Sequence, residues 1–219
     1  MSQQLEVTML SEIESVGIEL EGGWCENCIM PIIDKYRSKL HIAHARDGSV
    51  EVDFRCRKHK SNDNDGEFKA WAEVKELPLM FRFVKELFAT KGFHQNDSCG
   101  NHIHIRFKNK KIYEIFAIEG TWSNFIRKYR RAFRIPKYLS RLSNYYTDSK
   151  WEPDLEKDER RYKHYKRYKM INLQSLYEPQ HTLEFRILPH FRNGQEAINS
   201  YSKLLGAINE LAREGERPV

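Results

Sequence analysis

The chain has 219 residues, of which 40% are hydrophobic and 12% aromatic. That length and apolar content are enough for one substantial core, and we expect a single domain over residues 1–219. No stretch approaches the roughly 18–20 consecutive apolar residues of a membrane span. The polar start at residues 1–4 lacks the plan of a signal peptide. The sequence therefore predicts no membrane partner and a cytoplasmic location.

The net charge of +6 is unevenly distributed, because residues 127–169 hold 15 Lys/Arg against 6 Asp/Glu. A segment with this excess attracts anions, so nucleic acid or another polyanion is a candidate partner. A charge run on a helix can equally be a solvated surface without a ligand. Both interpretations stay open at this point.

The first stretch with a chemical signature is residues 17–21. In a strand, alternate side chains face opposite sides, so Ile18 and Leu20 can enter a core while Glu19 and Glu21 share the other face. Two neighbouring carboxylates repel each other unless a cation lies between them. A single pair of this kind is more often the solvated face of a sheet, so a cation site depends on further stretches with compatible chemistry.

Two later stretches show the same alternation. His102 and His104 fall on one face of a strand, and Glu184 and Arg186 fall on one face of another. If the three strands lie side by side, their polar faces form a platform for a divalent cation and a phosphate. Alternation is also typical of any half-solvated antiparallel sheet, which is the alternative interpretation.

Four residues form two pairs of potential ligands with the spacing of a tetrahedral zinc site: Cys25, Cys28, Cys56 and His59. We expect a zinc-binding element at 24–60. Buried free thiols and a Cys25/Cys28 redox pair are the alternatives. Cys99 stands apart and is expected to be structural.

Periodicity and turn residues predict the remaining elements. Helices are expected at 32–40, from Pro78 to about 91, from Trp122 to Phe133, and at 195–214; strands are expected at 50–54 after a turn at 47–49, and at 71–77. Polar residues 60–67 predict a loop, and residues 144–160 predict a long mobile loop.

The ordered set of motifs resembles the amidoligase family of carboxylate–amine ligases, whose fold is that of glutamine synthetase and glutamate–cysteine ligase. The matching stretches lie at 17–21, 47–49, 73–78, 99–105, 167–173 and 182–186. They follow the family's order and cover about residues 14–190. The resemblance implies an α+β fold, a curved antiparallel sheet with helices packed on one face.

The resemblance also implies ATP with Mg²⁺ or Mn²⁺ as cofactors. Such enzymes phosphorylate a carboxylate and let an amine displace the phosphate, which gives an amide or isopeptide bond. The implied metal ligands are Glu21 with Glu73 for one ion, and Glu19, His102 and Glu184 for another. The implied catalytic residues are Arg186, Glu184 and Glu19. His104 and Arg167 would face nucleotide phosphate, and Asn172 would orient a substrate.

The expected function is therefore an ATP- and Mg²⁺-dependent ligase acting on an amine and a carboxylate. The basic segment suggests that one of them is macromolecular or polyanionic. The chain is short for the fold, so another subunit of a homo-oligomer is one source of missing substrate-binding elements. The alternatives are a metal-dependent nuclease and a zinc-stabilised nucleic-acid-binding protein. The Cys/His quartet is outside the family's usual pattern.

Overall fold

A computed structural model describes residues 10–48, 50–52, 56, 58–59, 64–116, 118–144, 147–150, 169–173 and 181–215. Its strands are β1 Ile13–Trp24, β2 His41–Arg46, β3 Asn64–Glu73, β4 Phe93–His94, β5 Gly100–Phe107, β6 Ile171–Asn172 and β7 Leu183–Pro189. Its helices are α1 Glu26–Tyr36, α2 Leu77–Ala89, α3 Lys111–Phe116, α4 Glu119–Ala132, α5 Pro136–Leu139 and α7 Gly194–Gly215, with 3-10 turns η2 Val74–Glu76 and η3 Ser140–Ser143.

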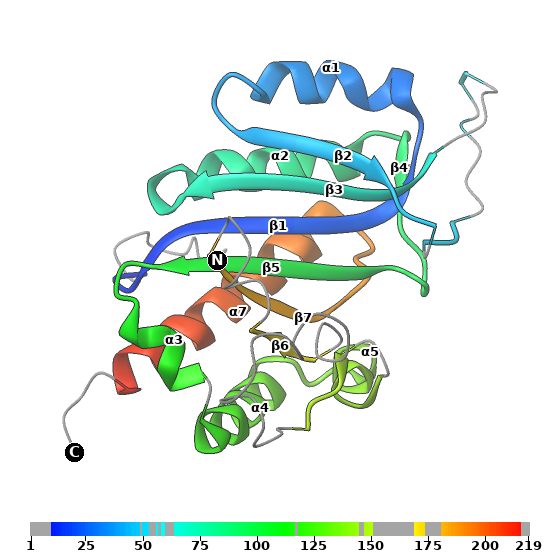
Figure 1. Ribbon diagram of the computed structural model, residues 1–219. Helices are drawn as coiled ribbons and strands as arrows, with labels where there is room; N and C mark the ends of the chain where they lie inside the picture. The colour runs from blue at the N-terminus through cyan, green and yellow to red at the C-terminus, as the bar shows by residue number, and fades with distance from the viewer. Residues whose placement is uncertain are drawn as a thin grey trace. The chain divides into compact units, whose positions relative to one another are not determined.

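Within these described residues, seven strands form one sheet in the order β2-β3-β1-β5-β7-β6, with β4 paired to β1 (Figure 1). The expected α+β class is confirmed, and the three strands with the alternating motifs, β1, β5 and β7, are neighbours. Membership of the glutamine synthetase-like fold stays a prediction. Among the described residues, no helix combines the length and apolar character that crossing a membrane requires.

The chain divides into two compact units. Unit 1 comprises Met1–Ser15, Ile103–Ile187 and Ser202–Val219, and unit 2 comprises Val16–His102 and Leu188–Tyr201.

In unit 2, α2 packs against α1 and β3 (Figure 1). Helix α2 buries residues that recur every three or four positions, which is the apolar stripe expected of a core helix: Leu77, Met80, Phe83, Val84 and Leu87. The ring of Phe68 lies 4.7 Å from Trp24 and 5.6 Å from Phe93 in edge-to-face contacts. This aromatic cluster fixes the end of β1 that follows the two glutamates.

In unit 1, α4 buries the predicted stripe of Trp122, Phe125 and Tyr129. The ring of Phe125 lies 5.4 Å from Phe185 of β7, and the Tyr129 hydroxyl donates to Ile187 O at 2.8 Å. Burial raises the pKa of Tyr129, so this hydroxyl stays a neutral donor. Helix α4 therefore holds the strand that carries Glu184 and Arg186.

Strand β2 was not expected, and β3 begins at Asn64, inside the loop predicted at 60–67. The two strands pair antiparallel, with Ala43 opposite Lys69 and Ala45 opposite Glu67. Backbone hydrogen bonds between the two strands stabilise this pairing. The polar side chains in these stretches give no strand pattern, so the sequence did not predict it. The strand expected at 71–77 ends at Glu73 and continues as η2, because Pro78 lies in the first turn of α2.

Other boundaries also differ from expectation. Helix α1 begins at Glu26 rather than at residue 32 and contains Pro31, and α3 was not expected. The turn at Asp47 is present, since Val50 N donates to Asp47 O at 3.1 Å, but residues 50–52 lie outside any strand. Residues 53–54, and residues 145–146 and 151–160 of the expected mobile loop, lie outside the described part of the chain.

Candidate functional site

A histidine lies between the two carboxylates of β1. Ile18 and Leu20 are buried, and the alternate positions present Glu19 and Glu21 to the opposite face. His102 Nδ1 lies 2.9 Å from Glu19 Oε2, and His102 Nε2 lies 3.7 Å from Glu21 Oε1. The exposed fractions of these side chains are only 5% for His102, 10% for Glu19 and 14% for Glu21. The predicted pairing of carboxylates with an imidazole is therefore present in unit 2.

A lysine and a third carboxylate from β3 join this group. Lys69 Nζ lies 2.8 Å from Glu19 Oε1 and 2.9 Å from Glu67 Oε1. Burial opposes the charge of Lys69, but the two carboxylates outweigh it and raise its pKa. Sequence reasoning missed both residues, although the alternation of Glu67 and Lys69 with buried Phe68 and Ala70 was a signal of the same kind.

Three largely buried carboxylates lie in this group: Glu19, Glu21 and Glu67. Burial and the charge of Glu19 raise the pKa of Glu67, because a second buried negative charge nearby disfavours its ionisation. Buried carboxylates of this kind are stabilised by a bound cation, and carboxylate oxygens with one imidazole suit Mg²⁺ or Mn²⁺.

Backbone and amide groups fix the orientation of Glu21. Its Oε2 accepts a hydrogen bond from Gly100 N, and its carbonyl accepts one from Gln95 Nε2 at 2.5 Å. Gln95 Nε2 also donates to Asn101 Oδ1 at 2.8 Å. Gln95 is buried and was missed by sequence reasoning, because nothing in its local pattern distinguishes it.

Unit 1 contains a second polar group, around Glu184 of β7. Glu184 Oε2 accepts from Asn172 Nδ2 at 2.6 Å, and Glu184 Oε1 lies 2.5 Å from Arg186 Nη1. Asn172 lies opposite Glu184 in the β6–β7 register. His104 Nδ1 lies 3.3 Å from Thr182 Oγ1, and His104 Nε2 lies 4.0 Å from Glu184 Oε1. Four residues singled out from the sequence thus meet here: His104, Asn172, Glu184 and Arg186.

Arg186 has donor capacity left for a ligand. Its side chain is 12% exposed, and its Nε is buried without a hydrogen-bond partner among the described residues. A guanidinium has five N–H donors in a planar fork that matches a phosphate or carboxylate. Arg186 can therefore bind an anionic group while it holds Glu184.

Two other sequence-predicted residues lie elsewhere. The side chain of Glu73 is 62% exposed, and its Oε2 lies 2.7 Å from Lys75 Nζ, so its carboxylate is engaged with a lysine at the end of β3. Arg167, expected to contact nucleotide phosphate, lies outside the described residues. Their predicted roles stay predictions.

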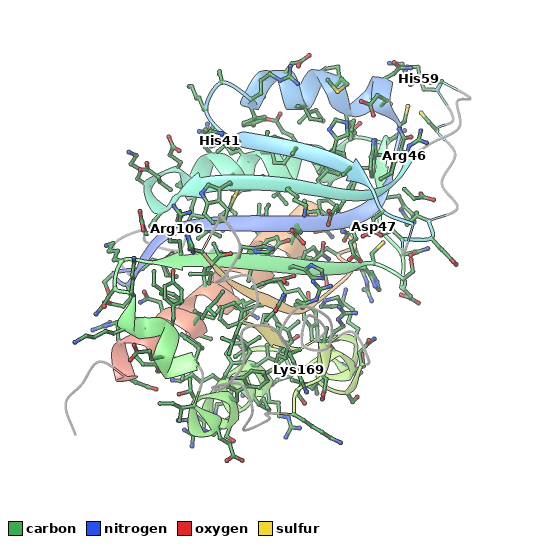
Figure 2. The ribbon with its side chains drawn as sticks, viewed as in Figure 1. His41, Arg46, Asp47, His59, Arg106 and Lys169 are labelled. Atoms are coloured by element: carbon green, nitrogen blue, oxygen red, sulfur yellow. The ribbon has the colours of Figure 1, made fainter. Side chains whose placement is uncertain are left out.

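The Cys/His quartet comes together in unit 2. His59 Nδ1 lies 3.2 Å from Cys25 Sγ, 3.4 Å from Cys28 Sγ and 3.6 Å from Cys56 Sγ, and the Cys28 and Cys56 sulfurs are 3.7 Å apart. Figure 2 labels His59 beside the first turn of α1. The cysteines are free thiols rather than a disulfide. The four residues form a group that could hold a zinc ion, as the sequence predicts.

The thiols of the quartet differ in acidity. Burial and the neighbouring thiols of Cys56 and Cys25 raise the pKa of Cys28 to about 12. Burial also opposes ionisation of Cys56, but hydrogen bonds from the backbone of His59 and Lys58 and from the Cys25 thiol lower its pKa to about 7.

Cys99 is separate from the quartet, as expected. It is buried in a small apolar cluster with Val50 and Val52. Burial raises the pKa of its thiol to about 11, which is typical of an inert structural cysteine.

Comparison of the chain with protein-family models, with curated proteins and with solved structures finds no match.

Proposed function

We propose that the protein is an ATP- and divalent-cation-dependent ligase that joins a carboxylate to an amine through an acyl phosphate. The observation that carries the proposal is the group of Glu19, Glu21 and His102, an imidazole held between two largely buried carboxylates. The resemblance of the ordered motifs to the amidoligases supplies the reaction class, and this group supplies a place for the cation that the reaction needs.

Glu19, Glu21 and His102 are the proposed ligands of Mg²⁺ or Mn²⁺. Hard oxygen ligands with one imidazole suit either ion. A cation held there would neutralise charge on the transferring phosphoryl group. Gly100 N and Gln95 keep Glu21 in place, so the carboxylates need little rearrangement to bind it.

Arg186 is the proposed anion-binding residue of the reaction. Its hydrogen bond to Glu184 fixes the guanidinium, and its buried Nε offers a donor to an oxygen of the phosphate or of the substrate carboxylate. Asn172 orients the other Glu184 oxygen. His104 is proposed to face nucleotide phosphate.

Calorimetric titration with a non-hydrolysable ATP analogue, with and without Mg²⁺, tests the proposal. We expect binding that requires Mg²⁺, that is lost in Glu184→Gln and that weakens at least about tenfold in Arg186→Gln. Arg82→Gln is the matched control, because Arg82 is exposed on α2. Absence of nucleotide binding in the wild type would contradict the ligase and favour a metal-dependent nuclease.

A second candidate function, binding of nucleic acid, is favoured by one observation on α4. A hollow of about 360 Å³ on this helix has a lining rich in arginine: Ser123, Ile126, Arg127, Arg130, Arg131 and Arg134. Among the residues that the structure describes, no carboxylate is part of the lining. Glu210 and Glu214 of α7 pair with Lys128, which is on α4 but outside the lining of the hollow. These two glutamates therefore do not neutralise the arginines of the hollow.

The guanidinium groups of the hollow are suited to phosphate. Arg127 donates to Asn124 Oδ1, whereas the side chains of Arg130, Arg131 and Arg134 have no hydrogen bond or ion pair within the described residues. Arginine binds phosphate bidentately and stacks on bases. We propose that this face binds single-stranded nucleic acid. Residues 151–168 of the basic segment 127–169 lie outside the described residues.

A further inference from the structure

We infer that Cys25, Cys28, Cys56 and His59 bind one structural zinc ion that fastens the segment following β2 to the start of α1. This site is independent of the proposed ligase chemistry. The inference is based on the distances within the quartet, on the way in which α1 begins, and on a glycine that the quartet requires.

The distances match a tetrahedral zinc site. With Zn–S bonds of about 2.3 Å and a Zn–N bond of about 2.0 Å, tetrahedral angles separate two sulfurs by about 3.8 Å and a sulfur from the nitrogen by about 3.5 Å. The Cys28 and Cys56 sulfurs are 3.7 Å apart, and His59 Nδ1 lies 3.2, 3.4 and 3.6 Å from the three sulfurs. All four ligand atoms lie within 4.8 Å of one another.

The same distances disfavour the alternatives. A disulfide needs two sulfurs about 2.0 Å apart, and no cysteine of the described chain is in a disulfide. If Cys25, Cys28 and Cys56 only filled a core, nothing would place His59 Nδ1 close to all three of their sulfurs. Cys99, which packs against Val50 and Val52, is an example of that second type in this protein.

The start of α1 lacks a side-chain cap, although Glu26 complements the helix dipole in the first turn. Its N-cap residue is Cys25, which makes no side-chain capping hydrogen bond, and Pro31 removes one hydrogen bond inside the helix. Cys28 N donates to Cys25 O at 2.9 Å, a tight turn that points both sulfurs toward His59. A zinc ion bound by Cys25 and Cys28 would hold this first turn in place of a cap.

A glycine allows the approach of Cys28. A Cβ on Gly92 would lie 2.1 Å from Cys28 Cβ and 3.0 Å from Cys28 Sγ, so no larger residue fits there. Gly92 O also accepts a hydrogen bond from Cys25 N at 2.9 Å. Gly92, three residues beyond the end of α2, thus supports both Cys25 and Cys28.

The local sequence suits a site with three thiolates. Three thiolates, a neutral imidazole and Zn²⁺ carry a net charge of −1, and Cys56 is flanked by basic residues in the sequence: Arg55, Arg57, Lys58 and Lys60. Cationic neighbours favour the thiolates that zinc requires. Because residues 28 and 56 are far apart in the chain, the ion would close a long loop and stabilise it accordingly.

The test is metal analysis of the full-length protein after reconstitution with zinc and removal of excess metal. We expect one equivalent of zinc in the wild type and in Cys99→Ala, and well under half an equivalent in Cys28→Ser and His59→Ala. Replacement by Co²⁺ should give the visible d–d absorption of a tetrahedral site together with sulfur-to-cobalt charge-transfer bands. Chelation should lower the melting temperature of the wild type, and zinc should restore it.

Three results would overturn the inference. The first is wild-type protein without bound zinc and with a melting temperature that neither chelator nor zinc changes. The second is full zinc occupancy in both Cys28→Ser and His59→Ala. The third is a Cys25–Cys28 disulfide in protein isolated under conditions that block thiols, which would identify a redox pair. Because the cobalt spectrum and chelation use the wild type, poor folding of a variant does not prevent a decision.

Discussion

His102 Nδ1 lies 2.9 Å from Glu19 Oε2, although 83 residues separate the two in sequence. The pair is buried, and Glu19 also contacts Lys69 Nζ at 2.8 Å. A carboxylate held in place by an imidazole and an ammonium group can exchange one of these contacts for a metal ion.

Glu67 and Glu73 are alternative carboxylates from β3 for the cation of unit 2. The resemblance implies Glu73, but the structure places Glu67 beside Lys69 and leaves Glu73 exposed beside Lys75. We expect Glu67→Gln to weaken Mg²⁺ affinity about tenfold to a hundredfold, and Glu73→Gln to change it less than about twofold. Calorimetry of both variants measures this. The opposite ranking would show that the exposed carboxylate moves to the metal.

The ion pair between buried Lys169 and Asp148 should stabilise the folded protein at neutral pH and lose this contribution in acid. Its Nζ donates to Asp148 Oδ2 at 2.6 Å and to Lys150 O at 3.2 Å, and Figure 2 labels it. Burial opposes the charge of Asp148, but the hydrogen bonds from Lys169 Nζ and Lys150 N and the charges of both lysines together outweigh it and lower the pKa of that carboxyl. Because the folded pKa lies below the unfolded one, the stabilisation is complete above about pH 4 and is lost as the pH falls through the folded pKa.

We therefore expect Asp148→Asn to lower the free energy of unfolding at pH 7 by about 1–3 kcal/mol, toward the lower figure because Asp148 is partly exposed. Urea denaturation from pH 7 to pH 3 measures the difference, which should shrink toward the acid end. Glu86→Gln is the control, since its pair with Lys35 is more exposed and should contribute under about 1 kcal/mol. A difference that is constant with pH would contradict the ion-pair account.

The arginines of α4 should control nucleic-acid affinity. We expect a labelled single-stranded oligonucleotide to bind with an affinity that falls with salt, and Arg130→Gln/Arg134→Gln to reduce the logarithmic salt slope by about 1 to 2. Fluorescence anisotropy measures both. Arg213→Gln, on the exposed surface of α7, should leave the slope unchanged. An equal effect of the two variants would mean that only net charge matters.

Two glycines give a matched test of close packing. Gly92→Ala forces a contact with Cys28 and should cost more than about 2 kcal/mol of unfolding free energy. Gly120→Ala has nothing within 4 Å and lies in the first turns of α4, so it should be neutral or stabilise by up to about 1 kcal/mol. Denaturation of both variants in the presence of zinc checks the contrast. A neutral Gly92→Ala would argue against close packing at Cys28.

The sequence was sufficient to predict residues whose role is visible in local alternation or spacing. Glu19 and His102 stand opposite buried residues in their strands, and Cys25-x-x-Cys28 with Cys56-x-x-His59 has a recognisable spacing. Lys69 was missed because its contact with Glu19 depends on the register of two strands, and register is set by tertiary packing rather than by either stretch alone.

Strand β2 and the start of α1 could not be predicted from the sequence, for related reasons. His41–Arg46 is half exposed and lies at one end of the strand order among the described residues, so its apolar pattern is weak. The helix expected at 32–40 begins instead at Glu26, directly after Cys25, and it includes Pro31, a residue that disfavours a helix interior. In both places, contacts distant in sequence override the local preference.

The most direct test of the proposed cation site is titration of the protein with Mn²⁺, followed by electron paramagnetic resonance of the free ion. The account predicts saturable binding by the wild type, competition by Mg²⁺, and loss of at least about tenfold in affinity in Glu19→Gln. Glu14→Gln, which changes an exposed carboxylate on the same strand, should bind like the wild type. Equal Mn²⁺ affinity in the wild type and Glu19→Gln would contradict the account.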